Sequence, residues 1–310
     1  MSILFVGGGR RTSLAKLFKQ ENIHIHGYET EANTPLSYEC SVHKGLGWEH
    51  PSLASDILYN LNTYHLRYLL PLQDAAAIKL HEIGLGDRVI GAGLEAARIC
   101  GDKHEFELFM EHHFYDIYPS RKRQKYPRII KPRFGFGSRN IRVVKSYDEE
   151  CDVRDNWEGG SNFWIVQDFI NGIEFTVDAY FDKSGGFVGA VPRIRLRVAA
   201  GEVVDSVTLD KPDLVKYTKE VGQKIGLRGP TCFQYVVNDE GQAYLIEINA
   251  RFGGGSILSC QAGFNMVQMI KQEYINDTPI SPADFQPIFG LLMRRTFTEY
   301  YFDVQKKTGD

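Results

Sequence analysis

The first hundred residues alternate between short apolar runs and segments whose apolar residues follow helical spacing. The apolar run 3–6 meets three glycines, and Leu14, Leu17 and Phe18 then recur at the spacing of one helix face. Strands are also predicted at 23–29 and 88–93, a helix at 94–113, and a strand followed by a helix within 68–84. Because strands that alternate with helices form parallel sheets, the alternation predicts a three-layer α/β domain over residues 1–100.

The pattern changes from residue 127 onward, where strands follow one another across tight turns such as DKSGG and NDEGQ. The predicted strands lie at 127–132, 141–145, 163–169, 174–182, 187–204, 231–238 and 243–249. Two helices interrupt them, near 147–156 and 211–226. This half is predicted to be a mixed, largely antiparallel α+β domain. The fold class of the whole chain is therefore α/β plus α+β.

The composition excludes several classes of protein. The net charge of −3 gives no overall signal for nucleic acid or membrane binding. The five cysteines are scattered without CxxC spacing, which argues against a disulfide framework or a structural zinc site and favours a reducing cytoplasm. The chain shows neither a signal-peptide pattern nor an apolar stretch of about 20 residues, so a cytoplasmic protein is expected.

The glycine turn at 7–9 separates the first strand from the first helix. A glycine turn before a helix can hold phosphate, but this turn lacks the G-x-G-x-x-G spacing and a clearly placed acid for a ribose. A tight turn that needs glycine dihedral angles is favoured over a dinucleotide site. A small substrate near the turn stays open, because ligands of open α/β sheets collect at the strand C-termini.

A second glycine-rich loop lies inside a strongly basic segment. Between Ile117 and Tyr147 there are ten basic residues and no Asp or Glu. The segment encloses KPRFGFGSRN, in which Gly135 and Gly137 allow close backbone approach and Ser138 can donate a hydrogen bond. Backbone N–H groups flanked by Lys and Arg can cradle a polyphosphate. A nucleic-acid surface, with Phe134 and Phe136 for stacking, is the less favoured alternative.

The strand 244–249 carries polar side chains at every second position. Since strand side chains alternate between faces, Tyr244, Ile246 and Ile248 are predicted to form a core face. Glu247, Asn249 and Arg251 fall on the opposite face. Charged groups inside a core are costly unless each has a partner, so this second face requires a charged neighbour.

The preceding strand supplies a further polar group to that face. A hairpin turn centred on 240–241 would place Gln234 directly opposite Glu247. Oxygen ligands completed by phosphate and water are those that Mg²⁺ takes, and a neighbouring Arg suits charge on a transferring phosphoryl group. A Glu247–Arg251 pair on a solvated sheet face is the alternative.

The order of these motifs resembles the ATP-grasp superfamily. The residues that carry the resemblance are Lys103, Lys131, the GFGS loop, VQDFINGIEFTVD at 166–178, Gln234 and EINARFGGG at 247–255. The chain looks most like the ATP-binding halves of the carbamoyl phosphate synthetase large chain and related carboxylate–amine ligases. Because the resemblance covers nearly the whole chain, it implies a Rossmann-like N-terminal (pre-ATP-grasp) domain at 1–100. An ATP-grasp domain would follow at 101–310, with a lid subdomain at about 115–167.

The resemblance also implies roles for individual residues. ATP would be held by Lys103, Lys131, Gly135, Gly137, Ser138, Gln167, Asp168, Phe169, Ile170 and Glu174, with Glu174 on the ribose. The Mg²⁺ ligands would be Gln234, Glu247 and Asn249, and the catalytic residues Arg251, on the γ-phosphate, and Lys131. The expected cofactors are therefore ATP and Mg²⁺.

The strand around 193–197 suggests the substrate side. Arg193 and Arg195, with Arg197, fall on one face and would bind a carboxylate or acyl phosphate. A solvent-exposed edge strand protected by its charges is the alternative, favoured for Arg197. Asp74, which follows a predicted strand, would meet an amine.

The expected function is an ATP- and Mg²⁺-dependent carboxylate–amine ligase that forms an amide bond through an acyl phosphate. An ATP-binding regulatory or partner subunit without ligase chemistry is the alternative. A nucleic-acid-binding protein built on the basic segment is a third. The expected partners are a small-molecule carboxylate and an amine, with a homodimer left open and no membrane.

Overall fold

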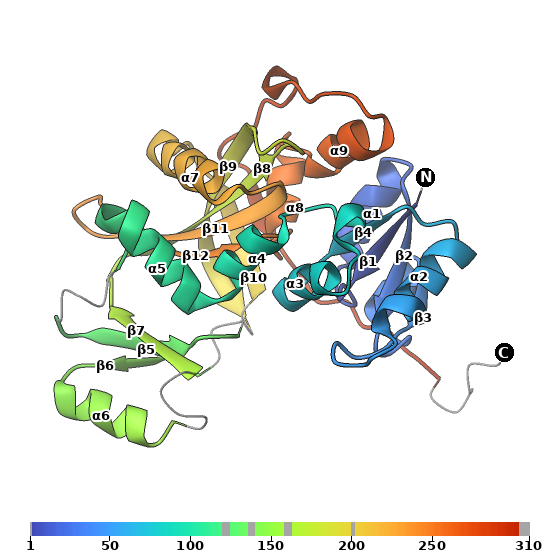
Figure 1. Ribbon diagram of the computed structural model, residues 1–310. Helices are drawn as coiled ribbons and strands as arrows, with labels where there is room; N and C mark the ends of the chain where they lie inside the picture. The colour runs from blue at the N-terminus through green and yellow to red at the C-terminus, as the bar shows by residue number, and fades with distance from the viewer. Residues whose placement is uncertain (1, 120–124, 136–139, 158–162, 200–201, 304–310) are drawn as a thin grey trace.

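The N-terminal part is built on a four-stranded parallel sheet, as the alternating pattern predicts (Figure 1). The structure, a computed structural model, describes residues 2–119, 125–135, 140–157, 163–199 and 202–303. The strand order is β3-β2-β1-β4, with β1 at Ser2–Val6, β2 at His24–Glu29, β3 at Ser41–Lys44 and β4 at Tyr68–Pro71. The carboxyl ends of the strands therefore share one edge of the sheet.

Helices cover both faces of this sheet. Ile3 and Phe5 of β1 pack with α1 (Thr12–Gln20), whereas Leu4 and Val6 pack with α2 (Leu53–Thr63) and α3 (Asp74–Glu82). This opposite packing follows from the side-chain alternation of a strand that is buried on both faces. Helix α2 was not predicted from the sequence.

Two local predictions were wrong in this region. The strand expected at 88–93 is reduced to a single bridge between Leu69 and Val89. The helix expected at 94–113 is divided into α4 (Leu94–Gly101) and α5 (Lys103–His113). Asp102 separates them, because its extended backbone ends α4 and its side chain accepts a hydrogen bond from the His104 N–H as the N-cap of α5.

A six-stranded antiparallel sheet forms the centre of the molecule. Its order is β12 (Ala243–Asn249), β11 (Gly229–Val237), β8 (Ile173–Phe181), β9 (Phe187–Ala199), β10 (Glu202–Thr208) and β13 (Leu292–Arg294). The run expected as one strand at 187–204 is thus divided between β9 and β10. Since β9 lies inside the sheet, the edge-strand explanation of its arginines is wrong.

A three-stranded sheet of order β6-β5-β7 lies apart from the central sheet and carries α6 (Figure 1). These elements span β5 Arg128–Pro132, β6 Arg142–Val144, α6 Tyr147–Asp155 and β7 Trp164–Asp168. The remaining helices are α7 (Pro212–Ile225), α8 (Ser256–Gln261) and α9 (Met266–Ile270). Short 3₁₀ turns lie at Pro35–Tyr38, Gly86–Arg88, Tyr115–Ile117 and Pro282–Asp284, and a π turn at Lys271–Ile275.

A shared core joins the N-terminal sheet to the central sheet. Phe5 and Phe18 belong to one buried cluster with Phe252 and Met266. The rings of Phe18 and Phe252 lie 6.4 Å apart, so α1 packs directly on the segment that follows Arg251. Across the residues that the structure describes, no helix combines the length and apolarity needed to cross a membrane.

Candidate active site

The hairpin of β11 and β12 brings the predicted oxygen ligands together. Gln234 pairs with Glu247, and Cys232 pairs with Asn249, which confirms the predicted register at this end of the hairpin. The register shifts by one residue between Gln234 and Tyr235, so Tyr235 pairs with Leu245. Ile246 is the extra residue of this β-bulge.

The bulge changes which side chains face the core. Leu245 and Ile248 belong to the central hydrophobic cluster, whereas Tyr244 and Ile246 do not. The prediction that Tyr244, Ile246 and Ile248 share a core face was therefore wrong for the first two. A bulge inserts one residue and so reverses the alternation on one side of it. Glu247 and Asn249 keep their common face because both lie beyond the bulge.

A chain of hydrogen bonds connects the polar residues of this face. Asn249 Nδ2 donates to Glu247 Oε1 at 3.3 Å, and Arg251 Nη2 donates to Asn249 Oδ1 at 2.6 Å. Glu247 stays partly exposed, whereas Asn249 is buried. The three side chains expected to act together are thus in direct contact.

The oxygen donors suit Mg²⁺ that is completed by phosphate and water. In the described part of the chain, no group of three or more His, Cys, Asp or Glu side chains could hold a metal ion. The set Gln234, Glu247 and Asn249 offers one carboxylate and two amide oxygens from adjacent strands. Mg²⁺ binds commonly through one or two carboxylates plus substrate phosphates, so the donor set fits that ion.

Arg251 joins this face to the N-terminal sheet. Its Nη2 lies 2.8 Å from Oδ2 of Asp74, the first residue of α3. The ion-pair partner of Arg251 is thus Asp74 rather than Glu247, which was the alternative considered from the sequence. Burial disfavours the charged form, but the nearby Asp74 carboxylate outweighs it and raises the pKa of Arg251.

Two lysines from other elements face the same region. Lys131, on β5, is 7% exposed, and its Nζ donates to the backbone oxygen of the bulged Ile246 at 3.4 Å. Burial lowers the pKa of Lys131 to about 8, Glu247 opposes this shift and Lys103 adds to it. Lys103 begins α5, and its Nζ donates to the Gly135 backbone oxygen at 3.0 Å. The cations from β5 and α5 therefore lie opposite the acid of β12.

The structure describes both ends of the predicted phosphate loop but not its centre at 136–139. Gly135 has φ 143°, a conformation that favours glycine, whereas Gly137 and Ser138 lie outside the described residues. Arg133 donates to both carboxylate oxygens of Asp102, at 2.7 and 2.5 Å. This pair fixes the start of the loop to the N-terminus of α5.

The residues predicted to hold adenine follow one another along β7 and beyond it. Gln167 is buried and donates to the Tyr118 hydroxyl, and Asp168 is also buried. Phe169 is 37% exposed, and its N–H donates to the Pro127 oxygen at 3.1 Å. Ile170 is partly buried.

The predicted ribose ligand and a predicted substrate ligand pair with each other. Arg195 Nη1 lies 3.0 Å from Oε2 of Glu174, which is exposed. Arg197 forms its own exposed pair with Asp205. The first pair places Arg195 next to Glu174, the residue expected on the ribose.

Arg193 lies in a different environment from the one expected. It is 2% exposed and donates to Asp178 at 2.8 and 3.4 Å. The hydroxyls of Ser256 and Ser259 donate to the same carboxylate at 2.7 and 2.6 Å. The structure thus places Arg193 inside the contact between the sheet and α8, not on an open substrate face.

Sequence reasoning did not identify the residues around the glycines 253–255. Arg295 donates to Glu202 at 3.1 Å and to the Gly254 oxygen at 2.7 Å, and Arg11 also reaches Gly254. The glycine turn GGGRR drew attention to the segment that contains Arg11. Nothing in the sequence connects Arg11 with Gly254, because the two residues lie far apart along the chain.

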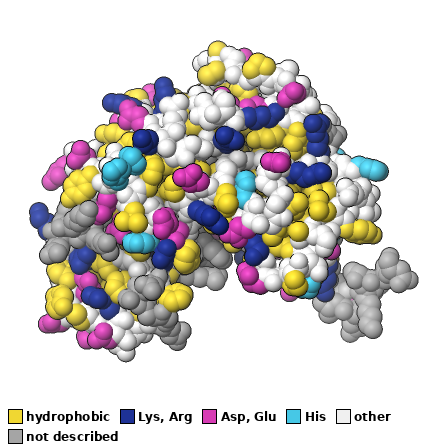
Figure 2. Space-filling view, in the orientation of Figure 1, with side chains coloured by type: hydrophobic (Ala, Val, Ile, Leu, Met, Phe, Trp, Pro, Cys, Tyr) yellow, Lys and Arg dark blue, Asp and Glu magenta, His cyan; other side chains and the backbone are white. Residues whose placement is uncertain are grey.

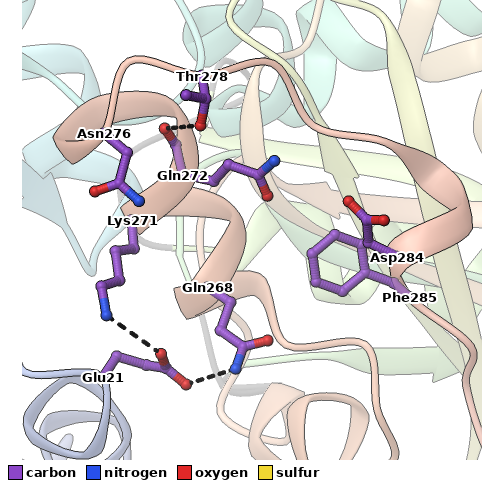
Figure 3. Close-up of a pocket in the computed structure, with 8 residues that line it drawn as sticks. All are labelled: Glu21, Gln268, Lys271, Gln272, Asn276, Thr278, Asp284 and Phe285. Atoms are coloured by element: carbon purple, nitrogen blue, oxygen red, sulfur yellow. Dashed lines mark hydrogen bonds and ion pairs between the residues drawn. The ribbon is translucent and has the colours of Figure 1, made fainter.

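The described surface includes a hollow and a separate pocket. In Figure 2 the molecule is hollowed at its lower edge, between the part built on the three-stranded sheet and the N-terminal part, with acidic and basic side chains at the border. A separate pocket of about 420 Å³ is lined by Glu21, Gln268 and Lys271 (Figure 3). Gln268 donates to Glu21 at 2.9 Å, and no predicted site residue lines this pocket.

Comparisons with known proteins match both the sequence and the fold. The profile of the ATP-grasp domain matches residues 100–255. The carbamoyl phosphate synthase large chain of Clostridium acetobutylicum is 28% identical over 218 residues, which cover 62% of this chain and 20% of that protein. The chain thus spans only about a fifth of that relative's length.

Two solved structures share the fold. The biotin carboxylase domain of the Hydrogenobacter thermophilus 2-oxoglutarate carboxylase, in complex with MgADP and bicarbonate, superposes with a TM-score of 0.70 and 16% identity. The alignment covers 92% of this chain and 72% of that one. The L-amino acid ligase of Bacillus licheniformis gives a TM-score of 0.67 and 14% identity, with coverage of 92% and 77%.

Proposed function

Because the chain belongs to the ATP-grasp family, we propose that it is an ATP- and Mg²⁺-dependent ligase that joins a carboxylate to an amine. The relative from Clostridium acetobutylicum is a carbamoyl phosphate synthase large chain, and one neighbour in fold is an L-amino acid ligase. Both names support a reaction in which ATP activates an acid for attack by nitrogen. The proposed intermediate is an acyl phosphate.

One observation carries the proposal. The hydrogen-bonded series Glu247, Asn249 and Arg251 lies opposite Lys131, whose Nζ reaches the bulge of the same strand. This arrangement combines oxygen donors for a cation with fixed positive groups for phosphate oxygens. Such preorganised charges stabilise the charge that moves between oxygens during phosphoryl transfer.

The residues of the chain have separate roles in this proposal. Gln234, Glu247 and Asn249 would hold Mg²⁺, which would neutralise phosphate charge when bound. Lys103 and Lys131 would bind nucleotide phosphates, and Arg251 would orient the γ-phosphate toward the acid. The loop that begins at Gly135 would exclude water from the acyl phosphate. No covalent protein nucleophile is required.

The nucleotide and substrate would lie along the same face. Gln167, Asp168, Phe169 and Ile170 would hold adenine, and Glu174 would bind the ribose. Arg195 would bind the substrate carboxylate once nucleotide takes Glu174. Arg193 is left out of this role, because it is buried and paired with Asp178.

The domain division is part of the proposal. Residues 1–100 would form a Rossmann-like pre-ATP-grasp domain, and residues 101–310 the ATP-grasp domain. The parallel sheet at the N-terminus supports the first assignment. The separate three-stranded sheet with α6 supports a lid subdomain at about 115–167.

The proposal is tested by substrate-dependent ADP release. The purified chain is supplied with ATP and Mg²⁺ and screened against amino acids and small carboxylates, each alone and with an amine. Glu247→Gln is expected to lose most of the release, about 100-fold, because one charged ligand becomes neutral while the side-chain volume stays the same. Thermal unfolding of both proteins provides the control for folding. Full ADP release by the variant would contradict the metal assignment.

An ATP-binding regulatory subunit is the alternative function. Under that alternative, the wild-type chain binds ATP but no acid stimulates ADP release. The continuous contact from Glu247 to Arg251 favours the ligase, because binding alone does not need an Arg beside the metal ligands.

A further inference from the structure

Arginines from three distant parts of the chain surround the glycines that follow Arg251. A side-chain carbon on Gly254 would lie 3.0 Å from Arg11 Nη1 and 2.6 Å from Glu202 Oε2. Arg295 Nη2 donates to the Gly254 oxygen at 2.7 Å. Glycine is required at this position because charged side chains approach its backbone so closely.

The acids near this loop do not satisfy all of its arginines. Arg251 pairs with Asp74 at 2.8 Å, and Arg295 pairs with Glu202 at 3.1 Å. Among the residues that the structure describes, the Arg11 side chain has no hydrogen bond or ion pair of its own, and the buried Nε of Arg251 has no acceptor. A partly buried guanidinium without an acceptor is costly, so the arrangement favours an added anion.

The electrostatic environment agrees with this geometry. Burial lowers the pKa of Arg11, the charge of Arg251 lowers it further, and Glu202 only partly opposes the shift. Burial and the neighbouring arginines thus disfavour the charged form of Arg11 more than Glu202 favours it. An anion bound beside it would restore the balance.

The first glycine turn directs Arg11 to this place. The Arg11 N–H donates to the Gly8 oxygen at 2.7 Å, and its Cγ lies 3.7 Å from the position of a side-chain carbon on Gly8. The packing of Phe18 on Phe252 holds α1 against the glycine loop. The turn thus holds Arg11 at the C-terminal edge of the sheet, the place where the sequence left a small substrate open.

We propose that Arg11 binds an anionic group of the acid substrate, a carboxylate or a phosphate of a small molecule, beside the γ-phosphate site. This inference rests on the proposed ligase function. Arg251 contacts Asn249 of the metal-binding face and Asp74 of the N-terminal part, so it lies between the two. Because Lys103 and Lys131 lie on the metal-binding side, Arg11 is positioned for the acid substrate and not for the nucleotide.

The test separates nucleotide binding from anion binding. Calorimetry first measures the affinity of the full chain for ADP with Mg²⁺, and then titrates inorganic phosphate or succinate into the nucleotide-bound protein. Arg11→Met is expected to weaken the anion roughly 10- to 100-fold, as the loss of a charge-assisted hydrogen bond predicts. Arg11→Lys is expected to recover part of the affinity. Arg10→Met is the matched control, since Arg10 is the exposed neighbour in the same turn.

Each outcome has a defined meaning. If Arg11→Met loses affinity for succinate alone, the substrate group that Arg11 binds is a carboxylate. If the variant loses affinity for phosphate alone, that group is a phosphate. Equal anion affinities of wild type, Arg11→Met and Arg11→Lys would overturn the inference, as would a wild type that binds Mg–ADP but neither anion. A wild type that fails to bind Mg–ADP would overturn the proposed function and the inference with it.

Discussion

Two charged clusters lie side by side on the central sheet and differ in how far their side chains are closed to solvent. In one, Arg193 and Asp178 are 3% and 0% exposed at their side chains, and two serine hydroxyls complete the carboxylate. In the other, Glu247, Asn249 and Arg251 are hydrogen-bonded, and the side chains of the Arg251–Asp74 ion pair are 11% and 32% exposed. Each arginine keeps one buried nitrogen without a partner among the described residues, Nη1 of Arg193 and Nε of Arg251. Cys232 pairs in register with both Asn249 and Asp178, so the clusters are adjacent.

The difference separates structural charge from charge available for function. Both clusters combine an acid with an arginine on neighbouring elements, so residue type does not distinguish them. The Asp178 cluster is closed to solvent, and its removal should affect folding. The cluster of Glu247 and Arg251 is partly open to solvent and so can take a ligand, and its alteration should affect chemistry.

The largest predicted effect is on stability. Asp178→Ala leaves Arg193 buried without an acid, so the free energy of unfolding is expected to fall by about 3–5 kcal/mol in urea denaturation. Asp205→Ala is the matched control, because its partner Arg197 is 65% exposed and the expected loss is at most about 1 kcal/mol. Equal losses in the two variants would remove the distinction drawn between the clusters.

An intermediate effect is predicted from the pKa of Lys131. Burial lowers this pKa to about 8, so the free protein loses a cation from the phosphate side as the pH rises through 8. Affinity for Mg–ADP is expected to fall about tenfold between pH 7 and 9.5, as the loss of one charge-assisted hydrogen bond predicts. In Lys131→Met, the affinity for Mg–ADP should no longer fall over this pH range. Fluorescence titration of both proteins with Mg–ADP measures the difference.

The same lysine predicts the sign of a stability change. The unfolded chain keeps its proton to about 10.5, whereas the folded chain releases it near 8. Since the unfolded state binds more protons between these values, the contribution of Lys131 to the free energy of unfolding rises with pH in that window. If the free energy of unfolding fell with pH in this window for the wild type but not for Lys131→Met, the burial assigned to Lys131 would be contradicted.

The smallest predicted effect concerns the exposed pair of Arg195 and Glu174. Arg195→Gln is expected to change the free energy of unfolding by less than about 1 kcal/mol, because Glu174 is 52% exposed at its side chain. If Arg195 binds substrate, the same variant raises the KM for the acid while the affinity for Mg–ADP is retained. Unchanged KM would remove Arg195 from the site and leave the pair as a surface contact.

Local pattern was enough to find one face of the site. Strand alternation placed Glu247, Asn249 and Arg251 together, because it depends only on residues near in sequence. Gln234 lies opposite Glu247 as predicted, although the turn pairs Val237 with Ala243, because the bulge at Ile246 then shifts the register by one residue. The parallel N-terminal sheet followed from the alternation of strands and helices in the same way. The bulge at Ile246 was not predicted, since nothing in a run of apolar residues marks which one is left unpaired.

Only the tertiary structure decided how the charges are shared. Asp74 lies 177 positions from Arg251, and Arg11 reaches Gly254 because Phe18 packs on Phe252. Arg193 and Arg195 lie two residues apart on one strand, yet one is buried against Asp178 and the other borders the exposed Glu174. The sequence determined which side chains alternate along each strand, because backbone geometry is local. Burial and charge compensation depend on contacts between distant segments, and these formed only when the sheets packed together.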